Sequence, residues 1–364
     1  MRSVIFPLSC VVLLTLLSLQ SAQAQTLSNC QPAPPLSPTV KPGISGFDLS
    51  HDGRTLLVAN GDGYIRFVDM TSGQVQRVLI GHTNVVYRAV FSHDEKLIAS
   101  SSRDLTARVW DWMSGHELWR ATGFRCPVKA AVFSPDSRLL AVAGNDGLLK
   151  LYDVKTRKEL RSLIHINSAT VDMSVYSLVF GSDGSKVYAG NGDGTISEWD
   201  VTSGKETRTW AAHDGKAFKL VFNPDYSLLA SIGEDTNVKL WDVKTGREVR
   251  SLSMFRNSEA IVVPTEVRFS NDGKMVAASV VAMDQKQTSY LYIETLVWSA
   301  NTGDKLFTIE GHKLDVPALI FSKDDRYLLT GSVDQTIKFW DMKTGLLAKT
   351  FKISIERVQT LGLQ

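Results

Sequence analysis

A repeated segment ending constrains this chain of 364 residues more than any other feature of its sequence. Seven times, a short apolar run closes with an aromatic or apolar residue followed by Asp or Ser. The seven pairs are Val68-Asp69, Trp110-Asp111, Tyr152-Asp153, Trp199-Asp200, Trp241-Asp242, Trp298-Ser299 and Trp340-Asp341. Four of the six steps between them are 42 residues long, and the other two are 47 and 57 residues. A period of this length indicates stacked copies of one structural unit.

Each unit has the pattern of four short strands. An apolar run leads into a turn that contains Asp, as at Asp94 and Asp136, and a second run such as Leu97–Ser100 follows. A third strand ends at the Trp-Asp pair, and a small turn such as Thr71-Ser72-Gly73 leads to a fourth. No helical period competes with this pattern. We therefore predict an all-β fold, a seven-bladed β-propeller of four-stranded antiparallel blades over residues 43–351, because one blade cannot bury its two faces alone.

The Trp-Asp endings, together with Gly81-His82 and Gly311-His312, resemble the WD-repeat β-propeller family. This resemblance implies a buried hydrogen-bond relay of His, Ser or Thr, Asp and Trp within a blade. Three blades match the relay by position: His82, Ser100, Asp104 and Trp110; His213, Ser231, Asp235 and Trp241; His312, Thr330, Asp334 and Trp340. A buried carboxylate and a buried indole N–H both need partners, so we expect a structural role for these histidines rather than a catalytic one.

The other four blades depart from the relay pattern. The first and third blades have Val68 and Tyr152 in place of Trp, and the fourth has Ala189 at the position of the hydroxyl. The sixth blade contains an insertion, which predicts a longer approach near Arg256–Pro264 and an extended loop near Ala282–Tyr292. Irregular loops on a rigid repeat often carry function, although an insertion without function is equally ordinary.

Two ways of closing the ring remain open. The seventh blade has its own four strands in order, which requires no exchanged strand. Residues 352–364, the C-terminal tail, include a segment from Val358 that fits the first-strand pattern. That segment could replace Ile44–Ser50 as the inner strand of the first blade, or belong to a truncated eighth unit. We expect closure of a seven-bladed ring.

Residues 1–24 have the pattern of an export signal. Arg2 is followed by an apolar stretch over Val11–Leu19 and by Ala22-Gln23-Ala24, a small-x-small cleavage site. The stretch is shorter than the roughly 20 residues of a membrane span, so no span is expected after cleavage. Residues 25–42 form a proline-rich arm. The chain has no Asn-x-Ser/Thr glycosylation site, so we expect an exported protein in the bacterial periplasm or outside the cell.

Cleavage of this signal would leave two cysteines, Cys30 and Cys126. In an oxidising compartment they could form a disulfide, which would contribute about 4–5 kcal/mol by the chain-entropy estimate. Two unpaired thiols are the alternative, and the sequence does not decide between them.

Composition and motifs argue against several classes of protein. The chain has 40 Lys and Arg against 38 Asp and Glu, a balance that does not suit nucleic-acid binding. No catalytic, phosphate-binding or metal-binding motif is present, so we expect no catalytic residue, no metal and no cofactor. Two enzyme alternatives stay open: a lactonase-like or hydrolase-like propeller with a metal in its central channel, and a quinoprotein-like propeller. The second rests on the motif over Asp111–Trp119 in a single blade.

The resemblance also implies a face for a partner. WD-repeat propellers commonly bind proteins through positions near the start of each first strand and before each turn Asp. Matching positions in this chain are Tyr87, Arg103, Lys129, Asn145, Tyr176, Lys216, Phe218, Glu234 and Asp315. We therefore expect a non-enzymatic scaffold that binds a protein or peptide on this face, since exposed aromatic residues and Arg are common interface anchors. Alternatively, these side chains fill the layer of first strands.

Overall fold

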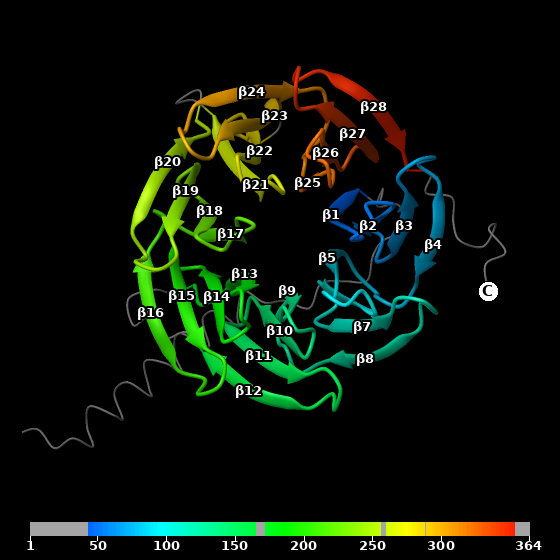
Figure 1. Cartoon of the computed structure of the whole chain (residues 1–364), viewed down its shortest axis with the longest axis vertical. Helices are drawn as coiled ribbons and strands as arrows, with labels where there is room; N and C mark the ends of the chain where they lie inside the picture. Colours follow the sequence, from blue (N-terminus) through cyan, green and yellow to red (C-terminus); the bar gives the residue numbers. More distant parts are fainter. Residues whose placement is uncertain (1–42, 165–171, 256–259, 288, 354–364) are drawn as a thin grey trace, which may run out of the picture.

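The computed structural model describes residues 43–164, 172–255, 260–287 and 289–353. Over these residues the chain forms seven four-stranded antiparallel sheets arranged in a ring around one axis (Figure 1). Each sheet is built from four consecutive strands, and every regular element in the described part of the chain is a strand. The predicted all-β, seven-bladed propeller is confirmed.

The strands of each blade run outward from the axis in chain order. The innermost strands are β1 (Ile44–Leu49), β5 (Val86–Phe91), β9 (Val128–Phe133), β13 (Val175–Phe180), β17 (Ala217–Phe222), β21 (Ile261–Phe269) and β25 (Ala318–Phe321). The second strands are β2 (Thr55–Asn60), β6 (Leu97–Ser102), β10 (Leu139–Gly144), β14 (Lys186–Asn191), β18 (Leu228–Gly233), β22 (Met275–Met283) and β26 (Tyr327–Gly331).

The seven repeated pairs, four of them Trp-Asp, close the third strands, as expected. These are β3 (Ile65–Asp69), β7 (Ala107–Asp111), β11 (Leu148–Asp153), β15 (Thr195–Asp200), β19 (Asn237–Asp242), β23 (Tyr290–Ser299) and β27 (Thr336–Asp341). The outer strands are β4 (Val75–Leu79), β8 (Glu117–Ala121), β12 (Glu159–Ile164), β16 (Glu206–Ala211), β20 (Glu248–Ser253), β24 (Lys305–Glu310) and β28 (Leu347–Lys352).

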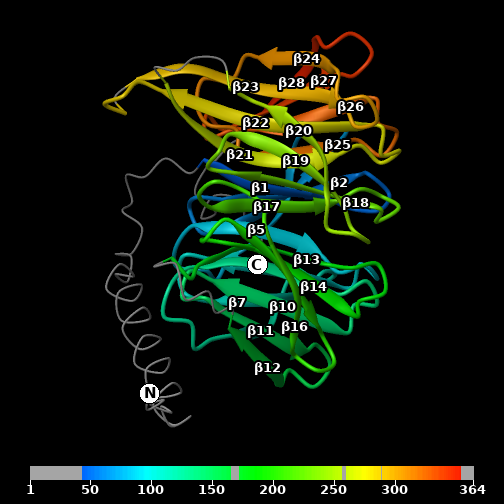
Figure 2. The ribbon, with the colours of Figure 1, turned by 90° about the vertical axis from the view of Figure 1, so that its left-hand side faces the viewer.

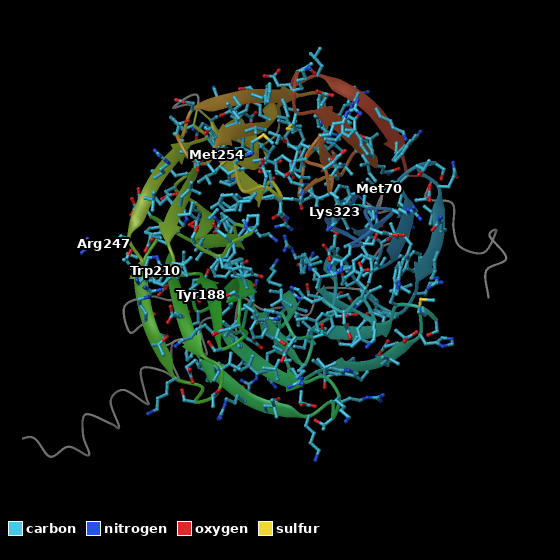
Figure 3. All side chains as sticks on the ribbon, in the orientation of Figure 1. Met70, Tyr188, Trp210, Arg247, Met254 and Lys323 are labelled. Carbon is cyan, nitrogen blue, oxygen red and sulfur yellow. The ribbon has the colours of Figure 1, made fainter. Side chains whose placement is uncertain are left out.

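Burial follows the position of a strand in its blade. Second strands such as β6 are buried along nearly their whole length, because neighbouring blades cover both of their faces. Outer strands such as β12 are largely exposed and carry charged residues, which oppose edge-to-edge pairing. Arg247, just before β20, points away from the ring (Figure 3).

The core consists of apolar layers between adjacent blades. Between the first and second blades, Trp112 packs on Phe67 and Phe91, with ring centroids 5.2 Å and 4.9 Å apart. Trp119 of the second blade similarly lies 5.6 Å from Tyr152 of the third. One such layer separates each pair of blades, so the seven repeats share a continuous core.

The ring closes by face packing between the first and seventh blades. β1 is the inner strand of the first blade and pairs with β2, and its residues share an apolar cluster with β26 and β27. The Ile44 N–H donates to the Ser332 carbonyl at 3.3 Å. Glycine is needed at position 43, because a Cβ there would lie 2.7 Å from the Cα of Val333. Residues 354–364 lie outside the described residues, so the role of the tail stays a prediction.

The insertion in the sixth blade forms longer strands where the sequence analysis expected loops. β21 and β22 each have nine residues and β23 has ten, and the pairing continues through Val263, Val281 and Ile293. The insertion is rich in β-branched residues, which favour strands. The tip of the β22–β23 hairpin projects from one face of the ring (Figure 2).

The predicted signal segment at residues 1–24, the proline-rich arm at residues 25–42 and Cys30 lie outside the described residues. Cys126 is buried and disulfide-bonded. Its pairing with Cys30 stays a prediction. No helix long and apolar enough to cross a membrane occurs within the described ranges.

Candidate functional site

A pocket of about 560 Å³ opens at the axis, on the face where the inner strands begin, which we call the amino face. The opposite face, which carries the turns from first to second strands, is the carboxyl face. Five of the nine predicted partner-binding residues line this pocket: Tyr87, Lys129, Tyr176, Phe218 and Asp315. They come from five different blades. The size is typical of a pocket that holds a few side chains of a ligand.

The other four predicted residues lie outside the lining of the pocket. Arg103 and Asn145 are on turns between second and third strands, where their N–H groups donate to Val85 and Pro127. Lys216 and Glu234 form an ion pair, with Nζ 3.4 Å from Oε1. This pair engages both side chains within the protein itself.

Aromatic rings form one part of the pocket wall. Tyr176 and Phe218 meet edge to face with centroids 5.6 Å apart, and the Tyr176 hydroxyl donates to Asp172 at 3.3 Å. Burial, together with the Asp172 carboxylate, raises the pKa of Tyr176 above its ordinary value. On the second and third blades, the Lys129 Nζ lies 3.8 Å from the centroid of the Tyr87 ring. The wall therefore offers apolar surface beside a cation.

A cluster of charged side chains lies at the axis below the pocket. The Glu266 carboxylate accepts from Arg88 at 2.7 Å and from Arg268 at 2.9 Å, and the Lys219 Nζ is 3.7 Å away. Arg88 belongs to the second blade and Glu266 to the sixth, which are not neighbours in the ring (Figure 1). Burial opposes ionisation of Glu266, but Arg268 and Arg88 outweigh it and hold its pKa at about 2.

Positive charge predominates where this cluster meets the pocket. Burial and the nearby Arg88 lower the pKa of Lys219 to about 7. Burial and Arg103 lower the pKa of Lys129 to about 8. Lys129 has no carboxylate within ion-pair distance among the described residues, whereas Lys219 shares Glu266 with two arginines. The site is therefore poor in negative charge.

The residues at the axis do not suit the metal site of the enzyme alternative. In the described ranges, no three His, Cys, Asp or Glu side chains come together. Glu266 is surrounded by the cations Arg88, Lys219 and Arg268 instead. Three positive groups around one carboxylate would repel a metal cation.

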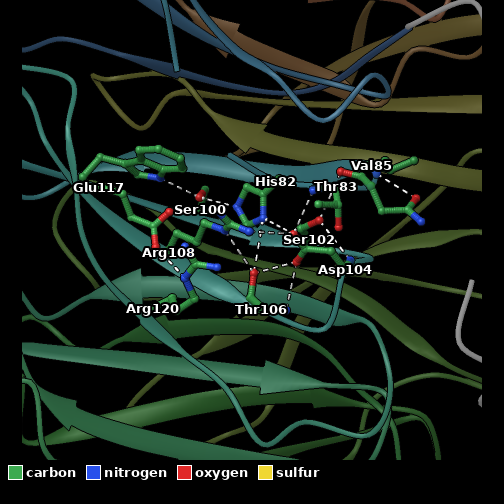
Figure 4. A network of polar contacts seen from close by, with 12 residues as sticks. His82, Thr83, Val85, Ser100, Ser102, Asp104, Thr106, Arg108, Glu117 and Arg120 are labelled. Atoms are coloured by element: carbon green, nitrogen blue, oxygen red, sulfur yellow. Dashed lines mark hydrogen bonds and ion pairs between the residues drawn. The ribbon is translucent and has the colours of Figure 1, made fainter. Parts of the chain in front are cut away.

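The structure connects the residues of each matched relay (Figure 4 shows the second blade). Trp110 Nε1 donates to Ser100 Oγ at 2.9 Å, and His82 lies 2.7 Å from both Ser100 and Asp104. Because an indole N–H can only donate, the Ser100 hydroxyl donates to His82 Nε2, and Nδ1–H donates to Asp104. Burial lowers the pKa of His82, which favours this neutral form.

The fifth and seventh blades repeat this arrangement. His213 lies 2.7 Å from both Ser231 and Asp235, and Trp241 donates to Ser231 at 2.8 Å. His312 lies 2.7 Å from Thr330 and 3.0 Å from Asp334, and Trp340 donates to Thr330 at 2.8 Å. The histidine and hydroxyl side chains are buried within their blades, away from the pocket lining.

The fourth blade replaces its missing hydroxyl from another strand. Trp199 Nε1 donates to Ser197 Oγ at 3.0 Å, and the Asn191 amide donates to the same oxygen at 3.0 Å. Sequence reasoning noted only Ala189 and missed Ser197. The available signal was a Ser two residues before the Trp, on the same side of β15.

Comparison with known proteins finds partial similarities. A 97-residue segment is 31% identical to "Eukaryotic translation initiation factor 3 subunit I" of Neurospora crassa, covering 26% of this chain and 25% of that protein. The protein of the same name from Pyricularia oryzae is 33% identical over 97 residues, or 26% of each chain. "Periodic tryptophan protein 2 homolog" of Schizosaccharomyces pombe is 30% identical over 91 residues, 25% of this chain and 10% of that protein. The chain spans about a quarter or less of these relatives.

The expected location in the bacterial periplasm or outside the cell is wrong by this comparison. The relatives are fungal proteins, and the name that recurs among them is that of a eukaryotic translation initiation factor subunit. That class conflicts with an exported bacterial protein. The prediction had depended on the pattern of residues 1–24 and on the absence of an Asn-x-Ser/Thr glycosylation site.

Five segments match the family described as "WD domain, G-beta repeat". They are residues 73–111, 115–153, 161–200, 204–242 and 303–341. Each match ends at the Asp that closes a third strand, in agreement with the predicted repeat. The unmatched stretches include the first three strands of the first blade, which has Val68 in place of Trp, and the first three strands of the lengthened sixth blade. Because the matched segments cover more than half of its residues, this chain belongs to the WD-repeat family.

Proposed function

We propose that the protein is a non-enzymatic scaffold that binds a protein or peptide partner on its amino face. The observation that carries this proposal is the axial pocket, where Tyr87, Tyr176 and Phe218 converge from three blades beside Lys129. Aromatic side chains in a concave site are effective anchors, because they bury a large area at a low cost in conformational entropy. The names of two relatives describe a subunit, a protein that acts within an assembly.

Replacing two of the aromatic anchors tests the proposal. Tyr87→Ala with Phe218→Ala removes one ring from each side of the pocket. We expect the double variant to remain folded. The amount of crosslinked partner should fall at least tenfold, as measured by quantitative crosslinking and mass spectrometry in native cells.

The matched control lies away from the pocket. Met113 and Leu346 are 74% and 69% exposed, on turns before outer strands. Met113→Ala with Leu346→Ala should leave the partner set unchanged. If the Tyr87 and Phe218 variant is folded by its circular dichroism and melting temperature yet keeps the wild-type partner set, the proposed face is wrong.

A further inference from the structure

The charges around the axial pocket do not balance. Arg88, Lys219 and Arg268 share the single carboxylate of Glu266. Asp48, also buried near this cluster, accepts the N–H groups of Phe91 and Leu49 instead, and burial raises its pKa. Its negative charge is therefore disfavoured. Even without the charge of Lys219, two arginines share one carboxylate, and a buried cation without a partner is costly, so the site favours an added anion.

Lys129 and Lys219 are the two cations that reach the pocket itself. Both line it, from β9 and β17, whereas Arg88 and Arg268 lie in the cluster beneath. Burial is the main cause that lowers the pKa of Lys219, and the ammonium of Lys129 adds to it. Because both side chains line one pocket, a single anionic group bound there would lie near both.

The carboxylates around the pocket face other groups than Lys129 and Lys219. Asp172 and Glu234 face Lys216, with carboxylate oxygens 4.0 Å and 3.4 Å from its Nζ. Asp315 lies on the wall formed by the seventh blade, where its carboxylate interacts with the Tyr290 hydroxyl. Among the described residues, none of these three carboxylates lies within ion-pair distance of Lys129 or Lys219.

Apolar surface surrounds the two lysines. Tyr87, Phe218 and Pro264 line the same pocket, and the volume of about 560 Å³ exceeds that of one side chain. A carboxylate bound here would thus have an apolar neighbour beside it. Desolvated ion pairs within an apolar rim combine affinity with specificity.

We propose that the amino-face pocket binds an acidic peptide segment of the partner, a Glu or Asp side chain flanked by an aromatic residue, with the carboxylate between Lys129 and Lys219. This inference rests on the proposed function and specifies its ligand chemistry. In this arrangement the flanking ring packs on Tyr87 or Phe218.

Two capped peptides that differ in one group test the proposal. The probes are fluorescein-labelled Gly-Ser-Phe-Glu-Phe-Ser-Gly and the same peptide with Gln for Glu, titrated with the full chain in a fluorescence anisotropy assay. We expect the Glu peptide to bind at least tenfold more tightly than the Gln peptide. Lys129→Met and Lys219→Met should each reduce that ratio to about one.

Lys323→Met is the matched control, because Lys323 is exposed on the carboxyl face. The Lys323→Met variant should keep the wild-type ratio between the affinities for the Glu and Gln peptides. Melting temperatures establish that all variants are folded. Equal binding of the two peptides, binding of neither, or a ratio that survives both pocket substitutions overturns the proposal. In each of these cases, partner loss in the Tyr87 and Phe218 double variant would still support the docking face, so the two proposals fail separately.

Discussion

The second and third blades carry an aspartate at the same turn, but the surroundings of the two carboxylates differ. Asp104 accepts from His82 at 2.7 Å, from the Thr106 hydroxyl at 2.6 Å and from the Thr83 N–H at 3.1 Å. Burial opposes its ionisation, but these donors outweigh burial and hold its pKa well below the usual range.

In the third blade, the hydrogen-bond donors to Asp146 among the described residues are backbone N–H groups, those of Arg125 at 2.8 Å and Leu148 at 3.3 Å. Phe124 occupies the place of the histidine and Val142 that of the hydroxyl. Burial therefore raises the pKa of Asp146. The turn therefore requires an acceptor for backbone N–H groups in both blades. The blade interior can be filled either by the polar relay or by apolar side chains such as Phe124 and Val142.

Blades with the relay and blades without it should differ most in how their stability changes at acid pH. The folded-state pKa values of Asp104, Asp235 and Asp334 are lowered, that of Asp235 to about 2. Their contribution is complete above the unfolded pKa of about 4 and is lost as the pH falls toward 2. We expect a loss of about 1 kcal/mol per relay after allowing for solvent screening, and therefore about 3 kcal/mol for the three relays together. Urea unfolding between pH 7 and pH 2.5 measures it.

Asp146 should act in the opposite direction, since protonation relieves the cost of its buried charge as the pH falls. An Asp104→Asn variant should show a shallower acid slope than the wild type. A stability that stays flat from pH 5 to pH 2.5 would contradict the pKa directions of the relays.

Neutralising each aspartate at pH 7 sharpens the comparison. Asp104→Asn removes the charged acceptor of His82 and should cost about 2–3 kcal/mol of unfolding free energy. Asp146→Asn should cost less than about 1 kcal/mol, because the amide oxygen still accepts the Arg125 N–H and no charge is buried. Urea denaturation of both variants provides the test. Equal losses in the two blades would show that the relay adds nothing to the turn.

The fourth blade offers the smallest and most specific test. Ser197→Ala leaves the buried Trp199 indole without its acceptor and should cost about 1–2 kcal/mol. Adding Ala189→Ser places a hydroxyl at the relay position of β14 and should recover part of that loss. Ala189→Ser alone serves as the control and should not stabilise the blade. No recovery in the double variant would mean that the two strands are not interchangeable sources of the hydroxyl.

The period of the sequence predicted much of the fold, because Trp-Asp endings about 42 residues apart mark the third strands directly. The lengthened sixth blade was not predicted, since a loop and a longer hairpin interrupt a period in the same way. Ser197 was missed because the relay pattern places the hydroxyl on the second strand, while the acceptor oxygen arrives from the third.

For the candidate site, the family positions predicted five residues of the pocket lining but none of the charges beneath it. Arg88 and Glu266 are 178 residues apart in the chain and meet only because the ring closes. The alternation of residues within β5 and β21 does not predict which side chains Arg88 and Glu266 meet across the axis. Alternation along a strand assigns side chains to faces, and the contact between distant blades depends on the completed ring.

The ion pair between Arg88 and Glu266 has a consequence for how the ring forms and opens. Propeller repeats otherwise contact only their neighbours, so a single blade can detach locally at modest cost. A contact between the second and sixth blades requires the long chain between them to close into a loop, which costs conformational entropy. We therefore expect this contact to form late in folding. We expect the second and sixth blades to open together, because opening either one breaks this ion pair.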